Sequence, residues 1–168
     1  VQALPSAGRG VTGGVTGGVA GGVAGGMAIL NWDDIRVRAM AEKTEARVFN
    51  YSADENAGLA NDDIDLWVSN VEGKGLDGVD FILHYRNRAS NTVEACPIQF
   101  QLIGRHNVQT ALCAAAVGLV EGLSWHEIRT GLEQNPKQIR LIPRAGIYGC
   151  LVIYDTYNAS TLSTTAAL

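Results

Sequence analysis

Residues 27–49 read MAILNWDDIRVRAMAEKTEARVF, and this stretch decides the fold class. Residues 27–30 are a short apolar run that suits a buried strand, and residues 31–34 follow as a polar turn and helix start. Apolar side chains recur at helical spacing over residues 37–41, and residues 46–49 form a second strand-like run. A strand, a helix and a strand within so few residues predict a βαβ unit with a parallel pair of strands.

The middle of the chain predicts an antiparallel meander. Three short runs alternate between apolar and polar residues, at 64–68, 81–85 and 97–102, with glycines between the first two. Such alternation is typical of strands with one buried and one solvated face.

Two helices and a strand follow. Residues 107–121 are apolar nearly all round, which predicts a buried helix that ends at Gly122. Ser124 and Glu127 match a capping box that opens a second helix. Residues 151–153 are expected to form a last buried strand. The fold class expected is therefore α/β, part of a mostly parallel sheet flanked by helices, with a small antiparallel β meander.

Composition excludes two classes of partner. The 168 residues carry a net charge of −4, and no basic run suits nucleic acid. No apolar run is long enough to span a bilayer, so no membrane span is expected. The three cysteines have no metal-ligand or redox spacing, which favours buried, reduced thiols.

Residues 11–26 are a tandem repeat in which eight of sixteen residues are glycine. Because glycine loses the most backbone entropy on ordering, this composition favours a flexible insert. A phosphate cradle is the alternative, but no lysine follows the tract where a phosphate-binding loop requires one.

Two polar segments are candidate ligand sites. Gly104 to Asn107 precede the buried helix, whose free backbone N–H groups suit polar ligands, although a simple helix cap by His106 or Asn107 is the more common role. Asp155 follows the last predicted strand, where ligands gather in α/β sheets, but an Asx turn explains it equally well.

Four segments together resemble motifs of the Mur ligase family, in the same order along the chain. They are Ala28–Asp34, Gly104–Val108 with the alanine-rich helix after it, Arg140–Leu141, and the hinge-like Ile153–Ala159. Within the family, the Tyr-Asn-Ala of the last segment is most similar to the hinge of ligases that add D-alanyl-D-alanine.

The resemblance implies a cytoplasmic, monomeric ligase of peptidoglycan synthesis that uses ATP and Mg²⁺. Such an enzyme joins D-alanyl-D-alanine to UDP-N-acetylmuramoyl-tripeptide through an acyl phosphate. The family's phosphate loop and magnesium-holding residues have no counterpart in these 168 residues. We therefore expect a fragment that is inactive alone, with neither a catalytic residue nor a metal ligand of its own.

The resemblance also implies residue roles. Asn107 is expected at the adenine, Arg140 at the phosphates, and Asp155 at the nucleotide ribose or the hinge. The ATP-binding residues implied are His106, Asn107, Arg140 and Asp155, and the substrate or hinge residues implied are Tyr157 and Asn158.

The resemblance also divides the chain. Residues 1–9 are expected to be the remnant of a preceding helix, and 10–26 a Gly-rich flexible insert. Residues 27–154 would form part of the central ATP-binding domain, and 155–168 the hinge and the start of a C-terminal domain.

Three departures from the family pattern leave rival interpretations open. Thr110 stands where the family has a second asparagine after the Gly104–Val108 segment. Ile139 replaces a glycine before Arg140, and Tyr154 replaces the first aspartate of the hinge-like segment. A degenerate remnant with weak or no nucleotide binding is one rival. A folylpolyglutamate synthase-like ligase is another, which the hinge at 155–159 disfavours.

Overall fold

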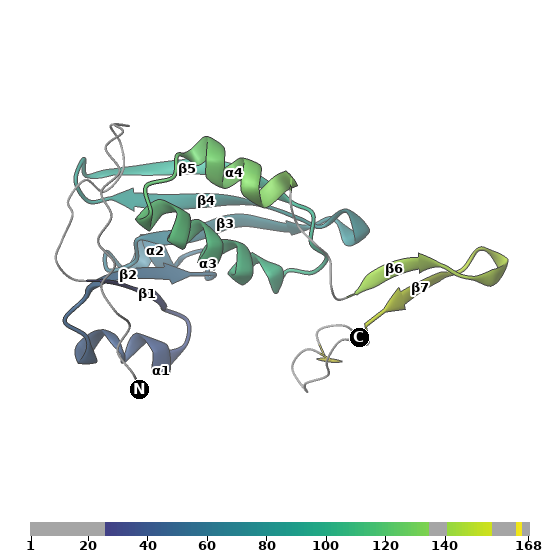
Figure 1. The fold of residues 1–168 in the computed structure, drawn as a ribbon, viewed down its shortest axis with the longest axis horizontal. Helices are drawn as coiled ribbons and strands as arrows, with labels where there is room; N and C mark the ends of the chain where they lie inside the picture. The colour runs from purple at the N-terminus through teal and green to yellow at the C-terminus, as the bar shows by residue number, and fades with distance from the viewer. Residues whose placement is uncertain (1–25, 135–140, 156–163, 166–168) are drawn as a thin grey trace.

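The computed structural model describes residues 26–134, 141–155 and 164–165. A five-stranded sheet with strand order β1-β2-β3-β4-β5 forms the body of the molecule (Figure 1). Its strands are β1 (Met27–Asn31), β2 (Arg47–Ser52), β3 (Leu66–Gly73), β4 (Val79–Asn87) and β5 (Thr92–Phe100).

The sheet is mixed along its width. Strand β2 pairs in parallel with β1 and β3, whereas β4 pairs antiparallel with β3 and β5. The predicted α/β class, with parallel strands, flanking helices and an antiparallel meander, is confirmed. Strand β3 pairs in parallel with β2 and antiparallel with β4, so the antiparallel strands extend the parallel ones within a single sheet.

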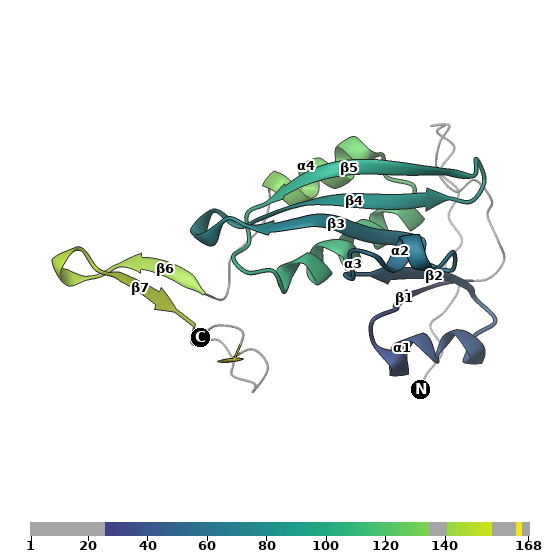
Figure 2. The ribbon, with the colours of Figure 1, turned by 180° about the vertical axis from the view of Figure 1, so that it is seen from behind.

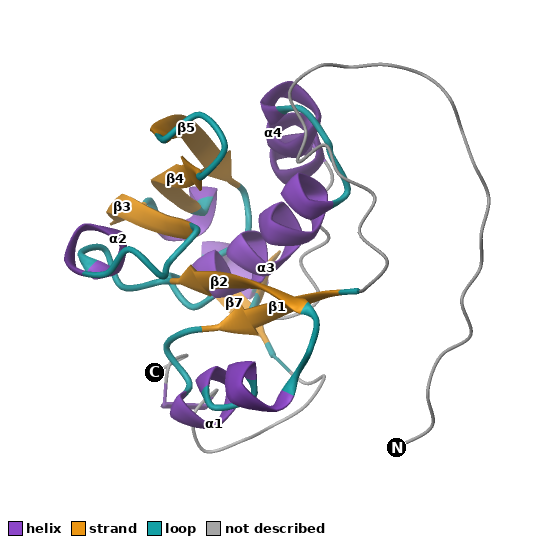
Figure 3. Ribbon diagram, turned by 90° about the vertical axis from the view of Figure 1, so that its left-hand side faces the viewer, coloured by secondary structure: helices purple, strands orange, loops and turns teal. Residues whose placement is uncertain are grey.

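Two helices, α3 (Asn107–Val120) and α4 (Trp125–Gln134), cover one face of the sheet. Figure 2, seen from behind, shows the sheet in front of them, and Figure 3 shows both helices on one side of the strands. Apolar side chains from this face and from the helices form the core, among them Phe49, Leu66, Val68, Phe81, Leu83, Ile98, Phe100, Ala111, Leu112, Ala115, Leu119, Ile128 and Leu132.

The capping box predicted at the start of α4 is present. The Ser124 hydroxyl accepts a hydrogen bond from the backbone N–H of Glu127 at 3.3 Å, and the Glu127 carboxylate accepts one from the Ser124 N–H at 2.8 Å. Each side chain thus satisfies a backbone donor that the first turn leaves open.

The helix predicted between the first two strands is shorter than its apolar spacing suggested. Helix α1 spans only Ile35–Arg38, and a single 3₁₀ turn follows at Ala41–Lys43. Asp34 caps α1 through its carboxylate, which accepts from the N–H of Arg36 at 2.8 Å. No residue of α1 is buried, so the segment has no packed face that would extend the helix.

The shorter elements complete the fold. Helix α2 (Ala57–Ala60) lies between β2 and β3, and 3₁₀ turns occur at Gly75–Asp77 and Ile147–Gly149. Strands β6 (Ile142–Ala145) and β7 (Leu151–Tyr154) form a separate two-stranded antiparallel sheet.

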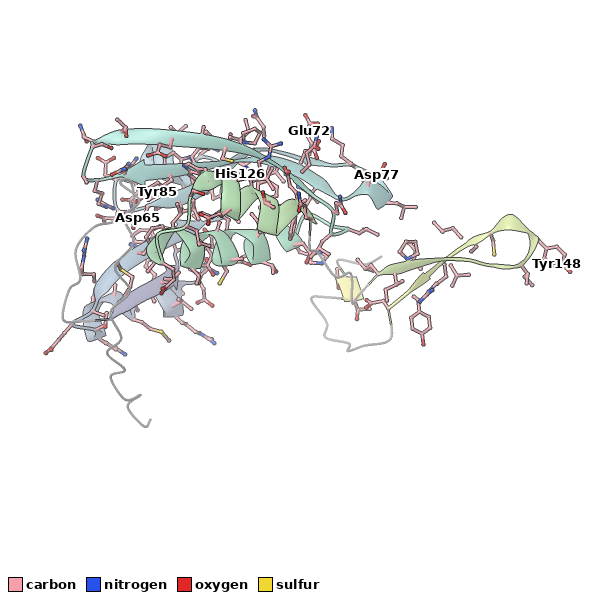
Figure 4. All side chains as sticks on the ribbon, turned by 45° about the horizontal axis from the view of Figure 1, so that its top comes forward. Asp65, Glu72, Asp77, Tyr85, His126 and Tyr148 are labelled. Carbon is pink, nitrogen blue, oxygen red and sulfur yellow. The ribbon has the colours of Figure 1, made fainter. Side chains whose placement is uncertain are left out.

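The expectation of a buried strand at residues 151–153 is wrong. All four residues of β7 are about half exposed, and β7 pairs with β6 in a hairpin that Figure 1 shows apart from the five-stranded sheet. Tyr148 lies at the tip of this hairpin (Figure 4). The apolar run by itself predicts a sheet interior, but an apolar run is buried only where a second layer covers it.

The cysteine prediction holds in part. Cys96 is buried as expected, but Cys113 and Cys150 are exposed, and all three are free thiols. Cys113 is exposed although it lies within α3, because a helix sequence that is apolar nearly all round does not show which of its positions face solvent.

No helix in the described residues is long and apolar enough to cross a membrane. Most of the proposed flexible insert, residues 10–26, lies outside the described residues.

Candidate functional site

The carboxyl ends of β1 and β2 lie side by side, because Asn31 is in register with Tyr51. The loop after β1 is held there by Asp33. One Asp33 oxygen accepts a hydrogen bond from the Ser52 hydroxyl, and the other accepts one from the Ala53 N–H at 2.8 Å. A single carboxylate therefore joins the ends of two neighbouring parallel strands.

Asn31 shapes the start of the same loop. Its side-chain oxygen accepts a hydrogen bond from the Asp33 N–H at 3.0 Å, which is an Asx turn. Asp34 is occupied as the cap of α1. The polar run Asn31–Asp34 thus builds the edge of the sheet with its own side chains.

The Gly104–Asn107 segment forms the turn before α3. Gly104 adopts a φ of +102°, which favours glycine over any residue with a side chain. The Asn107 side-chain amide donates to the carbonyl of Ile103 at 2.8 Å, which closes the turn.

The helix-cap interpretation of this segment is not what the geometry shows. His106 occupies the N-cap position but makes no side-chain capping bond, and its backbone is already helical. Asn107 bonds backward to a carbonyl, so it does not cap a free N–H group of the helix. One N–H and the side-chain oxygen of Asn107 are not used in that bond.

An ion pair fastens the turn to the carboxyl edge of the sheet. Arg105 lies 3.4 Å from a carboxylate oxygen of Glu55, in the loop after β2. The other Glu55 oxygen accepts from the Val71 N–H in β3 at 3.2 Å. Glu55 therefore links the start of α3 to the ends of the parallel strands.

An open depression of about 500 Å³ lies at this edge. Its lining residues come from the loop after β1, from the first turn of α1 and from the first turn of α3, and they are Asn31, Asp33, Asp34, Ile35, Arg36 and Gln109. Amide, carboxylate and guanidinium groups all face it, which suits a polar ligand better than an apolar one.

Tyr51 lies beneath the edge and is buried. Burial, the neighbouring Cys113 thiol and the Asp33 carboxylate together raise the pKa of Tyr51 to about 12. The phenol therefore stays protonated and remains a hydrogen-bond donor at neutral pH.

Only some of the predicted site residues lie in the described part of the chain. His106 and Asn107 begin α3, and the half-buried Asp155 directly follows β7. Arg140, Tyr157 and Asn158 lie outside the described residues. Their meeting with Asn107 around one nucleotide stays a prediction.

Sequence reasoning missed Ser52, Glu55 and Gln109. Ser52 and Glu55 lie in or after a strand with no motif around them. The pairing of β1 with β2 brings Ser52 to Asp33, and the packing of α3 against the sheet brings Arg105 to Glu55. Gln109 lies in the predicted helix, but a helix that is apolar nearly all round does not indicate which of its polar residues faces a site.

No group of three or more histidine, cysteine, aspartate or glutamate side chains suits a metal ion within the described residues. The carboxylates at the edge serve other purposes, since Asp33 joins two strands and Asp34 caps a helix.

Comparisons with known proteins agree with this architecture. The family model of the Mur ligase middle domain matches residues 20–118, more than half of the chain. A protein of Mycobacterium leprae named UDP-N-acetylmuramoyl-tripeptide--D-alanyl-D-alanine ligase is 38% identical over 148 residues, which cover 84% of this chain and 28% of that protein.

Two further relatives show the breadth of the similarity. The enzyme of the same name from Mycobacterium bovis is 34% identical over 144 residues, covering 83% of this chain and 25% of the relative. The UDP-N-acetylmuramoylalanine--D-glutamate ligase of Desulfitobacterium hafniense strain DCB-2 is 32% identical over 107 residues. The match covers 64% of this chain and 20% of that relative. The chain thus spans about a quarter of the length of the curated relatives it matches. On this match, this chain belongs to the Mur ligase family.

Proposed function

We propose that this chain supplies part of the ATP-binding domain of a peptidoglycan ligase that adds D-alanyl-D-alanine to UDP-N-acetylmuramoyl-tripeptide. Family membership and the names of the M. leprae and M. bovis relatives support the reaction. The observation that carries the proposal is the position of the Gly104–Asn107 turn. It begins α3 and is tied through Arg105 and Glu55 to the carboxyl ends of the parallel strands.

The carboxyl edge is where ligands bind in open α/β sheets. The remaining N–H and the oxygen of the Asn107 amide offer a donor and an acceptor side by side, which suit the adenine edge. The depression beside Asn31 and Gln109 offers room for a further part of the nucleotide. The residues present therefore fit the base end of ATP.

The phosphate end needs groups beyond the residues described. When bound, Mg²⁺ and a phosphate-loop lysine would neutralise charge as ATP phosphorylates the peptide carboxylate. The amine of D-alanyl-D-alanine then attacks the acyl phosphate and releases phosphate. We assign Asp33 and Asp34 no metal-binding role, because both carboxylates hold the loop.

The other predicted residues take proposed roles in the same scheme. His106 belongs to the Gly104–Asn107 turn, which contacts the adenine in this scheme. Arg140 contacts the phosphates, and Asp155 contacts the ribose or the hinge. Tyr157 and Asn158 form the hinge on the substrate side. The proposed enzyme is cytoplasmic and monomeric, and residues 155–168 begin its next domain.

We propose that the 168-residue chain alone has neither ligase nor ATPase activity, because its sequence contains no phosphate-binding loop. A chimera tests the proposal. Residues 26–155 of this chain would replace the corresponding segment of the M. leprae ligase. Phosphate release that needs ATP, UDP-N-acetylmuramoyl-tripeptide and D-alanyl-D-alanine would be measured.

The chimera is expected to retain D-alanyl-D-alanine-dependent turnover, while the isolated chain shows none. A folded chimera without turnover would contradict the proposal and favour the degenerate remnant. The departures at Thr110, Ile139 and Tyr154 are the first changes to revert in that case.

A further inference from the structure

A second cleft, of about 640 Å³, adjoins the depression at the carboxyl ends of β1 and β2, and Ile35 lines both. One wall is the α1 segment from Trp32 to Glu42, and the other is β2 with the residues before β3. The Val48 and Asn50 side chains in this cleft alternate along β2 with core residues that face α3. The cleft therefore opens on the face of the sheet opposite α3.

Asn50 lines the floor of this cleft and is held there by two hydrogen bonds. Its backbone N–H donates to the Asp65 carboxylate at 2.9 Å, and its side-chain N–H donates to the Asp63 carbonyl at 3.0 Å. The second bond fixes the direction of the amide, so the side-chain oxygen is the free acceptor. Asn50 is 8% exposed, and its oxygen has no hydrogen-bond partner among the described residues.

The charges around the cleft leave a negative excess. Asp65 is buried and pairs with Arg88 at 2.6 Å, so these two charges compensate each other (Figure 4 labels Asp65). The Arg38 guanidinium lies 5.0 Å from the centre of the Trp32 ring. Glu42 and Asp63 also line the cleft, and in the described part of the chain neither carboxylate forms an ion pair.

The carboxylates of Glu42, Asp63 and Asp65 line the cleft with three negative charges. Arg38 and Arg88 supply two positive charges, so the sum is −1. A monocation would balance it. The apolar surface of Trp32, Ile35 and Val48 in the same cleft suits a short hydrocarbon stem behind the charge.

The wall formed by α1 is loosely held. Helix α1 has no buried residue, and Ile35 is 70% exposed. Less than 1 Å² of the Asn50 side-chain oxygen is exposed, so a donor reaches it only when a segment beside it moves aside. A helix without a packed face shifts at little cost.

We propose that this cleft binds a cationic N–H donor on an apolar stem, namely an alkylguanidinium or alkylammonium group. An N–H of the cation donates to the Asn50 oxygen, the charge lies between Glu42 and Asp63, and the stem contacts Trp32. The proposal does not rest on the ligase function, because no residue of the Gly104–Asn107 turn takes part.

The test uses the ¹⁵N-labelled 168-residue chain and a matched pair of probes, propylguanidinium and its neutral isostere propylurea. Propylguanidinium is expected to shift the backbone amides of residues 32–42, 50 and 63–65. Glu42→Gln and Asp63→Asn should each weaken its affinity roughly threefold, as expected for the loss of one exposed charge. Glu45→Gln, an exposed change outside the cleft, is the control and should leave the affinity unchanged.

Three results would overturn the proposal. They are shifts scattered over the surface, equal affinity for propylurea, and an equal loss with Glu45→Gln. Asn50→Leu removes the acceptor directly, and a folded variant that still binds propylguanidinium with full affinity would also overturn it. If Asn50→Leu does not fold, the Glu42 and Asp63 variants decide alone.

Discussion

The Asp33 carboxylate, on the loop after β1, accepts a hydrogen bond from the hydroxyl of Ser52, the last residue of β2. Ser52 is fully buried, so this contact lies at the base of the proposed nucleotide-binding edge. The same carboxylate also accepts from the Ala53 N–H, and the two bonds together align the ends of β1 and β2.

Replacing Asp33 by Asn should destabilise the fold by about 1–2 kcal/mol, because the two hydrogen bonds lose their charged acceptor and the Ser52 hydroxyl must turn to accept from the new amide. Urea denaturation measures the change. The matched control is Asp34→Asn, which keeps a good capping residue and should change stability by at most a few tenths of a kcal/mol. Equal effects of the two changes would contradict the role given to Asp33.

Asn107→Asp should lower the stability of the chain. The change removes the donor to the Ile103 carbonyl and places two oxygens face to face at about the 2.8 Å of the present bond. That loss, about 1–3 kcal/mol, outweighs the gain of about 0.3–1 kcal/mol from a carboxylate at a helix start. Thermal unfolding measures it, and an unchanged Tm would show that the bond contributes nothing.

This expectation corrects a simpler one. From the sequence, Asn107→Asp separates a helix cap from an adenine contact, since Asp and Asn cap equally well. The backward bond to Ile103 makes the variant a poor probe of adenine binding, because a loss of affinity would mix with a loss of structure.

Gly58→Ala should be strongly destabilising. A Cβ at position 58 would lie 2.1 Å from the ring of Trp67, which is buried. Overpacking of this kind costs about 1–3 kcal/mol. Gly131→Ala is the control, because the site on α4 has nothing within 4 Å, and it should stabilise the helix by about 0.5–1 kcal/mol. Chemical denaturation of both variants checks the opposite signs.

The capping box predicts a pH dependence. Hydrogen bonds from the Ser124 hydroxyl and N–H hold the pKa of the Glu127 carboxyl below its ordinary value. A lowered folded-state pKa stabilises the fold above the ordinary value, and that contribution is lost as pH falls through the folded-state pKa. NMR titration of Glu127 should show an upward shift of its pKa in Ser124→Ala. An identical titration curve in the variant would show that the box does not hold the charge.

Local signals in the sequence were enough for several elements. The capping box placed the start of α4, and the apolar run from Asn107 placed α3, which ends within a residue of the expected position. Alternation indicated the three strands of the meander, and β4 and β5 do alternate between buried and less buried residues. The expected solvated face of residues 64–68 is wrong, because all five are buried and β3 continues to Gly73.

What the sequence did not reveal depends on contacts between distant residues. Apolar residues 151–153 were expected inside a sheet, but the burial of β7 depends on which layer covers it, and the run itself does not encode that. The Glu55–Arg105 pair joins residues fifty positions apart. No local pattern signals such a pair, so the geometry of the candidate site had to come from the structure.

The most direct test of the central claim, that the ends of β1 and β2 and the start of α3 form an adenine-nucleotide site, is an NMR titration of the ¹⁵N-labelled chain with ATP. The account predicts shifts at the amides of residues 31–36 and 104–109, with GTP giving weaker shifts at the same positions because the Asn107 amide matches the adenine edge. Shifts confined to other surfaces, or none at millimolar ATP, would contradict it.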